Sequence, residues 1–253
     1  MTADTRELLP VAVLAGGLGT RLHPITATRP KALIDVGGRP FILRQLEYLR
    51  DQGVGHVVLC TGYLGEQIEA AVGDGHAFGI EVRYSPDGPT LLGTGGALRR
   101  ALPMLGSSFF VLYGDSFLPC DFSEVQEAFL HSGKPALMTV LHNKQRWDRS
   151  NVIFRDGKIV VYDKRSVLTE MEHIDYGLGI VSAELLEPYP AEARFDLADI
   201  YHELSVSGRL AGCEVSERFY EIGTPKGLEE TSAYFAQRDS LSRRSTIRWG
   251  DKS

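Results

Sequence analysis

Short runs of β-branched and aromatic residues alternate with segments of helical periodicity along the first 142 residues. The runs predict strands at 10–15, 32–36, 56–61, 80–84, 109–113 and 136–141. The segments between them predict helices at 41–52, 66–72, 96–102 and 122–132. Because strands that alternate with helices form right-handed βαβ units, the pattern predicts an α/β fold with a doubly wound, mostly parallel sheet.

The pattern changes after about residue 143. Two short apolar runs at 151–154 and 158–162 flank Asp156-Gly157, a dipeptide that favours a two-residue hairpin turn. Later segments predict a strand at 174–182, a helix at 197–207, a strand at 212–215 and a helix after Pro225. We therefore expect a small antiparallel addition to the sheet, followed by a basic, solvated tail at 238–253.

The composition is that of a soluble globular protein, with 253 residues of which 43% are hydrophobic and 24% charged. We expect a single domain over 1–237, made of a first half at about 10–142 and a second half at 143–237. The formal net charge of −6 has the wrong sign for broad attraction to nucleic acid or to an anionic membrane. Any anionic ligand would have to be held by local positive charge.

Cysteine usage and the start of the chain bear on location. Cys60, Cys120 and Cys213 are far apart and odd in number, which favours reduced thiols in a cytoplasmic protein. The seven histidines are scattered and show no zinc-ligand spacing. The first 20 residues lack a secretory signal pattern, and no apolar stretch approaches the length of about 18 residues that a membrane span needs.

A glycine-rich loop follows the first predicted strand and runs from Leu14 to Lys31. Ligands of open α/β sheets collect where strands end at their carboxyl edge, so this loop is a candidate anion site. Its glycines, which permit positive φ and turn backbone N–H groups toward phosphate, are Gly16, Gly17 and Gly19. Arg21 and Lys31 add positive charge. The loop fits neither the dinucleotide fingerprint, which needs glycine where Leu22 stands, nor the Walker A loop.

The whole string, Gly-Gly-x-Gly-Thr-Arg-Leu-x-Pro-x-Thr-x-x-x-Pro-Lys followed by Val36 and Pro40, resembles the signature of the sugar-1-phosphate nucleotidyltransferases, or nucleotide-sugar pyrophosphorylases. The resemblance runs from Val11 to about Phe235. It implies a Rossmann-like nucleotidyltransferase fold with a nucleotide-binding first half and a sugar-binding second half. It also implies an Mg²⁺-dependent enzyme that converts a nucleoside triphosphate and a sugar 1-phosphate to an NDP-sugar and pyrophosphate.

The resemblance implies which residues bind the nucleotide. Lys31 would lie against the α-phosphate, and the string Leu92-Gly-Thr-Gly-Gly-Ala97 would contact the base. The nucleotide-binding candidates are Leu14, Ala15, Gly16, Gly17, Gly19, Thr20, Arg21, Lys31, Asp87, Gly93, Thr94 and Gly114.

The metal and sugar candidates come from later landmarks. An apolar strand ends in Gly114-Asp115, and an aspartate in such a position can hold Mg²⁺. The second metal ligand that the resemblance implies is Glu221, which stands where the family has aspartate. Lys164 would bind the attacking phosphate, next to Asp163 where the family has glutamate. The strings Ser150-Asn151 and Asp175-Tyr176-Gly177 fall at the family's sugar pocket and supply the candidates Asn151, Tyr176 and Gly177.

The implied reaction needs no nucleophile from the protein. An ionised sugar phosphate oxygen attacks the α-phosphorus in line, and pyrophosphate leaves on the opposite side. The catalytic candidates Arg21, Lys31 and Lys164 would act by positioning the two substrates and neutralising their charge.

Two other classes of protein are alternatives. Gly114-Asp115-Ser116 resembles a block of the GDS-type esterases, with Asp199 and His202 as the partners of Ser116 in a triad. This block stands late in the chain, and the Gly-x-Asn-Asp block of those esterases is missing. A non-catalytic nucleotide-sugar-binding module is favoured only by the departures at Asp163 and Glu221.

Fewer residues indicate which base and which sugar the enzyme would use. Guanine presents N1–H and N2–H₂ donors that suit a carboxylate, whereas uracil or thymine suits an amide such as Gln. The segment before the Gly-Thr string offers Asp87 and no Gln, which favours guanine. The compact chain is most similar to the heptose 1-phosphate guanylyltransferases, so we expect GTP with a heptose or mannose 1-phosphate. A uridylyl- or thymidylyltransferase for a hexose or amino-sugar 1-phosphate is the alternative, and a homo-oligomer stays open.

Overall fold

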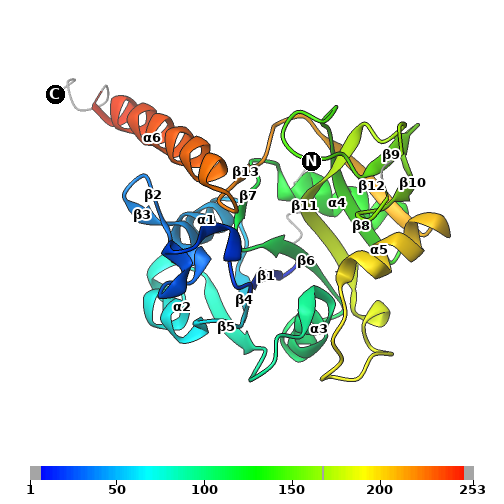
Figure 1. Cartoon of the computed structure of the whole chain (residues 1–253), viewed down its shortest axis with the longest axis horizontal. Coiled ribbons are helices and arrows are strands. Elements are labelled where there is room, and N and C mark those ends of the chain that lie inside the picture. Colours follow the sequence, from blue (N-terminus) through cyan, green and yellow to red (C-terminus); the bar gives the residue numbers. More distant parts are fainter. Residues whose placement is uncertain (1–6, 167, 248–253) are drawn as a thin grey trace, which may run out of the picture.

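The structure, a computed structural model, describes residues 7–166 and 168–247. Within these residues a nine-stranded sheet runs in the order β5-β4-β1-β6-β11-β8-β12-β10-β9 (Figure 1). Its strands are β1 (Val11–Ala15), β4 (His56–Thr61), β5 (Glu81–Pro86), β6 (Ser108–Tyr113), β8 (Ala136–His142), β9 (Val152–Arg155), β10 (Lys158–Tyr162), β11 (His173–Ser182) and β12 (Leu210–Val215). The α-helices are α1 (Phe41–Asp51), α2 (Gly65–Val72), α3 (Gly93–Ala101), α4 (Phe122–Ser132), α5 (Leu197–Val206) and α6 (Pro225–Ile247).

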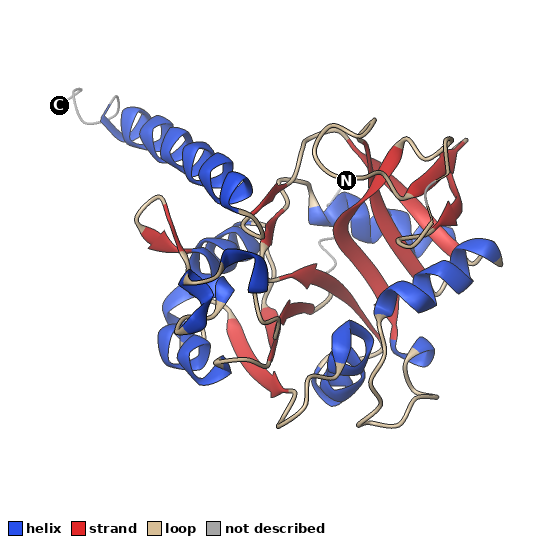
Figure 2. Cartoon of the chain, in the orientation of Figure 1, coloured by secondary structure: helices blue, strands red, loops and turns tan. Residues whose placement is uncertain are grey.

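Helices cover both faces of the sheet, which is why its strands are apolar on both sides (Figure 2). Val11 and Val13 of β1 belong to the core under α1, α2 and α4, whereas Ala12 between them belongs to the core under α3 and α5. The predicted α/β class with its doubly wound sheet is therefore confirmed.

The direction of the strands divides the sheet. β5, β4, β1 and β6 are parallel, and β8 and β12 form a second parallel pair. β11 lies between these two groups, antiparallel to both β6 and β8, so the sheet is mixed and less parallel than predicted. The predicted hairpin is β9–β10, which continues the same sheet at its edge. Asp156 and Gly157 at its turn have φ values of 51° and 73°, as the Asp-Gly pair predicts.

The strand predicted at 32–36 is wrong. Lys31–Leu33 forms a 3₁₀ turn, and only Asp35–Val36 (β2) is extended, paired with Arg39–Pro40 (β3). Gly37 and Gly38 turn between them at positive φ. Ile34 and Val36 pack into a small third core with Phe41, Ile222 and Phe235 instead of joining the sheet. Ala32 and Leu33 pack on the core under α1, α2 and α4.

The tail predicted at 238–253 begins inside a helix, because α6 continues to Ile247 and projects from the body (Figure 1). Two arginines hold this part of α6. Arg44 of α1 bonds Asp239 at 3.0 Å, and Arg238 lies 5.5 Å from the ring centre of Tyr48. Residues 248–253 lie outside the described residues. No helix in the described part of the chain is long and apolar enough to cross a membrane; the division into halves, the cytoplasmic location and a homo-oligomer stay predictions.

Candidate active site

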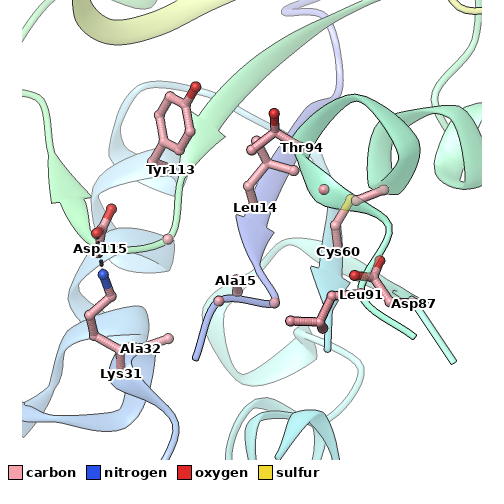
Figure 3. A pocket seen from close by; sticks show the side chains of 15 residues that line it. Leu14, Ala15, Lys31, Ala32, Cys60, Asp87, Leu91, Thr94, Tyr113 and Asp115 are labelled. Atoms are coloured by element: carbon pink, nitrogen blue, oxygen red, sulfur yellow. Dashed lines mark hydrogen bonds and ion pairs between the residues drawn. The ribbon is translucent and has the colours of Figure 1, made fainter. Parts of the chain in front are cut away.

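A pocket of about 230 Å³ lies where β1, β4 and β6 end (Figure 3). Parallel strands bring their carboxyl ends to one edge, so residues distant in sequence meet there. The lining includes the predicted nucleotide-binding residues Leu14, Ala15, Gly16, Gly17, Lys31, Asp87, Gly93, Thr94 and Gly114, together with Asp115. It also includes Ala97 of the predicted base-contacting string, and four residues that the sequence did not predict: Ala32, Cys60, Leu91 and Tyr113.

The signature loop needs glycine at Gly19 for its shape. Gly19 has a φ of +62°, and a Cβ there would lie 2.9 Å from Cγ2 of Thr26, whose hydroxyl donates to the Gly19 carbonyl at 2.9 Å. Gly19, Thr20 and Arg21 do not line the pocket. Arg21 instead reaches toward Gly223, because a Cβ at Gly223 would lie 3.5 Å from Nη2 of Arg21. The arginine therefore stands at the mouth of the site, on the side of Glu221.

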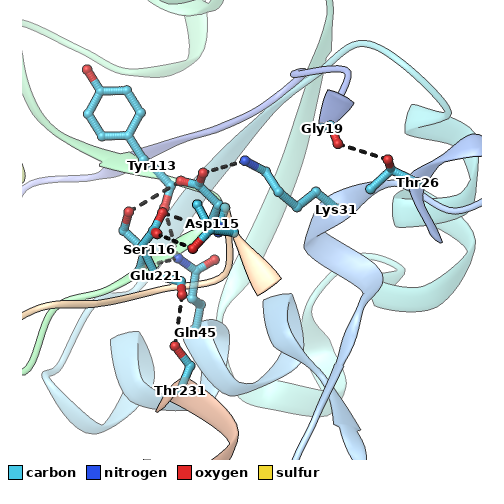
Figure 4. Close-up of polar contacts among 11 residues, drawn as sticks. Gly19, Thr26, Lys31, Gln45, Tyr113, Asp115, Ser116, Glu221 and Thr231 are labelled. Atoms are coloured by element: carbon cyan, nitrogen blue, oxygen red, sulfur yellow. Dashed lines mark hydrogen bonds and ion pairs between the residues drawn. The ribbon is translucent and has the colours of Figure 1, made fainter. Parts of the chain in front are cut away.

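Lys31 and Asp115 form the charged centre of the site (Figure 4). Nζ of Lys31 donates to Oδ2 of Asp115 at 2.5 Å, and both side chains are largely buried. Oδ1 of Asp115 accepts a 3.3 Å bond from the Ser116 hydroxyl. The turn that carries Asp115 is held from below, because the amide of Gln45 donates to the carbonyl oxygens of Tyr113 and Ser116.

Glu221 is brought beside Asp115 by a short strand pair. β7 (Ser116–Phe117) pairs with β13 (Tyr220–Glu221) so that Glu221 faces Ser116. The Ile222 amide also donates to the Asp115 carbonyl at 2.9 Å. The Glu221 carboxylate accepts bonds of 3.2 Å from the Gly223 amide and the Thr224 hydroxyl, which fix its direction.

These two carboxylates fit a hard divalent cation. Mg²⁺ is commonly held by one or two carboxylates, with substrate phosphates completing its oxygen ligands. Asp115 and Glu221 supply such a pair, and within residues 7–166 and 168–247 no group of three or more His, Cys, Asp or Glu could hold a metal ion. The pair therefore suits a metal that arrives with a phosphate ligand rather than a closed structural site.

Asp87 and Cys60 mark the far end of the pocket (Figure 3). Asp87 is 6% exposed; its Oδ2 accepts a 3.1 Å bond from the Leu92 amide, and its Oδ1 is buried without a partner in the described residues. Burial raises the pKa of the Asp87 carboxyl against the opposing effect of that amide and of Arg100. Burial, with Asp87 nearby, raises the pKa of the Cys60 thiol to about 12. The thiol is therefore protonated at neutral pH and forms an uncharged part of the pocket lining. Its position at the end of β4 is the signal that could have identified it.

The glycines of the Leu92–Ala97 string serve a second purpose. Gly93 has a φ of +76°, and a Cβ there would lie 2.6 Å from the Phe195 carbonyl oxygen. A Cβ on Gly95 would overlap the Phe195 ring, and one on Gly96 would overlap the Ala193 carbonyl. Only Gly93, Thr94 and Ala97 of these residues line the pocket. The string is therefore glycine-rich because the segment before α5 packs directly on it.

Lys164 adjoins the pocket from the second half of the chain. Its Nζ lies 5.7 Å from the ring centre of Tyr113, which lines the pocket at the strand ends. Asp163 and Lys164 also line a separate cavity of about 470 Å³ beside α5. Oδ1 of Asp163 accepts bonds from the Arg165 and Ser166 amides at 2.6 and 3.0 Å, and these N–H groups lower the pKa of its carboxyl. The Asp163 carboxylate thus stabilises the turn formed by the residues that follow it.

The remaining sugar candidates are divided by the pleat of β11. Tyr176 is 2% exposed, packs on Phe219 at 6.2 Å between ring centres, and lines none of the cavities described above. The Asp175 carboxyl instead lies near Lys164, and a Cβ on Gly177 would lie 3.7 Å from Leu118 and 3.8 Å from the Tyr113 ring. Oδ1 of Asn151 accepts a 2.9 Å bond from the Asp175 amide. The structure therefore brings Asn151, Asp175 and Gly177 together and places Tyr176 in the core.

The esterase triad is not assembled. The Ser116 hydroxyl bonds Asp115, a ring nitrogen of His202 contacts the Tyr162 carbonyl at 2.7 Å, and Asp199 is paired with Arg165 at 2.6 Å. Ser116 and His202 thus have other partners, and nothing links serine, histidine and aspartate as a hydrolytic triad requires.

Comparison with known proteins agrees with this geometry. The family model of nucleotidyl transferases matches residues 11–151, more than half of the chain. The chain belongs to this family. The nucleotidyl transferase is 31% identical over 227 residues to N-acetylmuramate alpha-1-phosphate uridylyltransferase of Neisseria meningitidis serogroup B, covering 87% of this chain and 96% of the relative. It is 28% identical over 215 residues to D-glycero-alpha-D-manno-heptose 1-phosphate guanylyltransferase of Campylobacter jejuni, covering 85% and 94%.

Solved structures give the same result for the nucleotidyl transferase. HddC from Yersinia pseudotuberculosis complexed with GMP-PN superimposes with a TM-score of 0.77 at 27% identity, covering 90% of this chain and 100% of that one. The predicted family, its fold and an enzyme of the sugar-1-phosphate nucleotidyltransferase class are thereby confirmed.

Proposed function

We propose that this nucleotidyl transferase converts GTP and a heptose or mannose 1-phosphate to the GDP-sugar and pyrophosphate. The observation that carries the choice of base is Oδ1 of Asp87, a buried acceptor in the nucleotide pocket without a partner in the described protein. Burying such an oxygen unpaired costs about 1–3 kcal/mol, which a ligand donor would recover. Guanine presents two adjacent N–H donors, whereas uracil and thymine present one N–H between two carbonyl groups.

The reaction follows from the charges around the pocket. An oxygen of the sugar phosphate forms a bond to the α-phosphorus, the bond from that phosphorus to the bridging oxygen breaks, and pyrophosphate leaves with the electron pair. Lys164 would bind the incoming phosphate, and Lys31 and Arg21 would bind the triphosphate. These three cations offset the repulsion between two polyanions in a protein whose net charge is −6.

Asp115 and Glu221 would hold Mg²⁺ when the nucleotide enters. The bound cation would supply positive charge to the phosphate oxygens. The 2.5 Å bond between Lys31 and Asp115 supports this proposal, because it brings a cation beside the carboxylate that would hold the metal.

A uridylyl- or thymidylyltransferase remains the alternative for the base. It is favoured by one observation, the 31% identity to the N-acetylmuramate alpha-1-phosphate uridylyltransferase of N. meningitidis. The relatives thus include enzymes named for both bases, and the pocket itself favours guanine through Asp87.

The experiment is a substrate panel with pyrophosphate release as the measurement. GTP, UTP, dTTP, CTP and ATP are each combined with heptose, mannose and glucose 1-phosphates in the presence of MgCl₂. We expect the highest kcat/KM with GTP and the heptose or mannose 1-phosphate, and no release without a sugar 1-phosphate. A preference for UTP or dTTP would overturn the proposed base while leaving the reaction class intact.

A further inference from the structure

Thr94 and Asp196 join the nucleotide pocket to the second half of the chain. The Thr94 hydroxyl donates to Oδ1 of Asp196 at 2.7 Å and accepts a 2.8 Å bond from the Leu197 amide. The same Oδ1 accepts a 2.9 Å bond from the Ala198 amide, so Asp196 is also the N-cap of α5. A residue of the nucleotide pocket thus fixes the position of a carboxylate that lies outside it.

Lys164 lies on the other side of this carboxylate. Asp196 and Lys164 line the same cavity beside α5, and Nζ of Lys164 faces the Tyr113 ring at 5.7 Å. In the part of the chain that the structure describes, Lys164 has no carboxylate within 4.0 Å. Its ammonium group is therefore available to a phosphate.

The acidic groups around Lys164 are not equivalent. Asp199 in the same cavity is paired with Arg165, and Asp163 is bonded to the amides of its own turn. Asp196 keeps a negative charge because the Ala198 amide, the Thr94 hydroxyl, Lys164 and Arg165 outweigh the effect of its burial and lower its pKa. Asp175 approaches Lys164 from β11, where burial raises the pKa of its carboxyl against the opposing effect of Lys164.

We infer that Asp196 is a positioning residue, held by Thr94, that keeps the ammonium group of Lys164 directed toward the nucleotide pocket. This inference rests on the proposed function, because it gives Lys164 the sugar phosphate as its ligand. Through the chain Thr94–Asp196–Lys164, a residue beside the nucleotide sets how the sugar phosphate is received. The influence of Asp196 on Lys164 is electrostatic, because no carboxylate of the described residues lies within 4.0 Å of Lys164. Since Asp196 and Lys164 are both exposed, this influence falls with salt.

The test is a double-mutant cycle. Asp196→Asn keeps the oxygen that caps α5 and removes the charge, so we expect about a 3- to 10-fold lower kcat/KM for the sugar 1-phosphate. The KM for the nucleotide and the melting temperature should stay unchanged. On a Lys164→Met background, Asp196→Asn should have no further effect, because the group through which Asp196 acts is gone. Raising the ionic strength should reduce the effect in the background that retains Lys164.

Three further variants complete the design. Thr94→Ser keeps the hydroxyl that bonds Asp196, so it should lower kcat/KM for the sugar phosphate less than Thr94→Val, which removes that hydroxyl. Asp199→Asn, in the same cavity but paired with Arg165, is the matched control and should leave kcat/KM unchanged. An equal loss from Asp196→Asn with and without Lys164, or a lower melting temperature that accounts for the loss, would overturn the inference. If the wild-type protein releases no pyrophosphate with any substrate pair, the proposed function fails instead.

Discussion

The two halves of the molecule hold their candidate residues in different ways. In the first half, the ends of β1, β4 and β6 and the glycine-rich loop line one pocket, and Lys31 meets Asp115 at 2.5 Å. In the second half, Lys164 is exposed beside a separate cavity, and Asp163 is bonded to its own turn. The first half therefore gathers backbone and partly buried charge around one pocket. In the second half, Lys164 lies exposed across Tyr113 and has no carboxylate within 4.0 Å among the described residues.

The largest effect is expected at the charged centre of the first half. Lys31→Ala or Asp115→Ala should lower kcat by about 100- to 1,000-fold, because each removes a partly buried charge from the proposed phosphate site. Pyrophosphate release measures the rate, and circular dichroism checks the fold. Lys226→Ala is the control. The Lys226 side chain in α6 is 85% exposed, and its ion pair with Glu230 at 3.7 Å is expected to contribute little. Near wild-type release from either pocket variant would contradict the assignment of the site.

A comparison of neighbours sharpens the account of the second half. Lys164→Ala should lower kcat/KM for the sugar 1-phosphate by about 10- to 100-fold, because a charged bond to phosphate is worth about 1.5–3 kcal/mol. Asp163→Ala should change it less than threefold, since the Asp163 carboxylate is used by the Arg165 and Ser166 amides. Steady-state kinetics at saturating nucleotide measures both. An equal loss for the two variants would mean that Asp163 also contacts the sugar.

Asp87 tests how the first half selects its base. Asp87→Asn replaces an acceptor oxygen with a donor, so GTP should lose about tenfold in kcat/KM relative to UTP. Burial raises the pKa of Asp87 above its usual value, so the stability it contributes is present at low pH and lost as the pH rises through that raised pKa. The variant should therefore be at least as stable as the wild type at neutral pH in thermal melts, and a large loss of stability would contradict this account.

The smallest effect is expected at Tyr176, which the family pattern assigns to the sugar. The Tyr176 hydroxyl is buried without a partner in the described residues. Tyr176→Phe should leave the KM for the sugar 1-phosphate unchanged and raise the free energy of unfolding by about 1 kcal/mol, because an unpaired polar group is removed from the core. Denaturant unfolding measures the second quantity. A rise in the KM would return Tyr176 to the sugar site.

The sequence predicted most of the pocket in the first half, although Gly19, Thr20 and Arg21 lie outside its lining and Cys60 was not expected. The glycine-rich loop and Gly114-Asp115 follow strands whose ends meet in any parallel sheet, so Lys31 and Asp115 could be predicted to converge. The third apolar core, which takes up Ile34 and Val36, could not be predicted, since it depends on Phe235 and Ile222, far along the chain.

The second half was harder to predict for the same reason. Whether Tyr176 or Asp175 faces the site depends on the register of β11 between β6 and β8, and a shift by one residue would exchange them. The carboxylate of Asp163 is turned away by amides two and three residues later. The glycines of the Leu92–Ala97 string were expected to face the base, but the neighbour that excludes a side chain at Gly93 and Gly95 is Phe195, a contact that only the folded chain reveals.

One measurement tests directly whether the two halves serve one reaction. The wild-type protein is incubated with GTP, a heptose 1-phosphate and MgCl₂, and the mixture is followed by ³¹P NMR. We predict that the signals of GTP and the sugar 1-phosphate decline together, while those of the GDP-sugar and pyrophosphate grow in a one-to-one ratio. Tight binding of GTP with all phosphate signals unchanged, for this sugar and for the rest of the panel, would instead show a non-catalytic binding module and contradict the account.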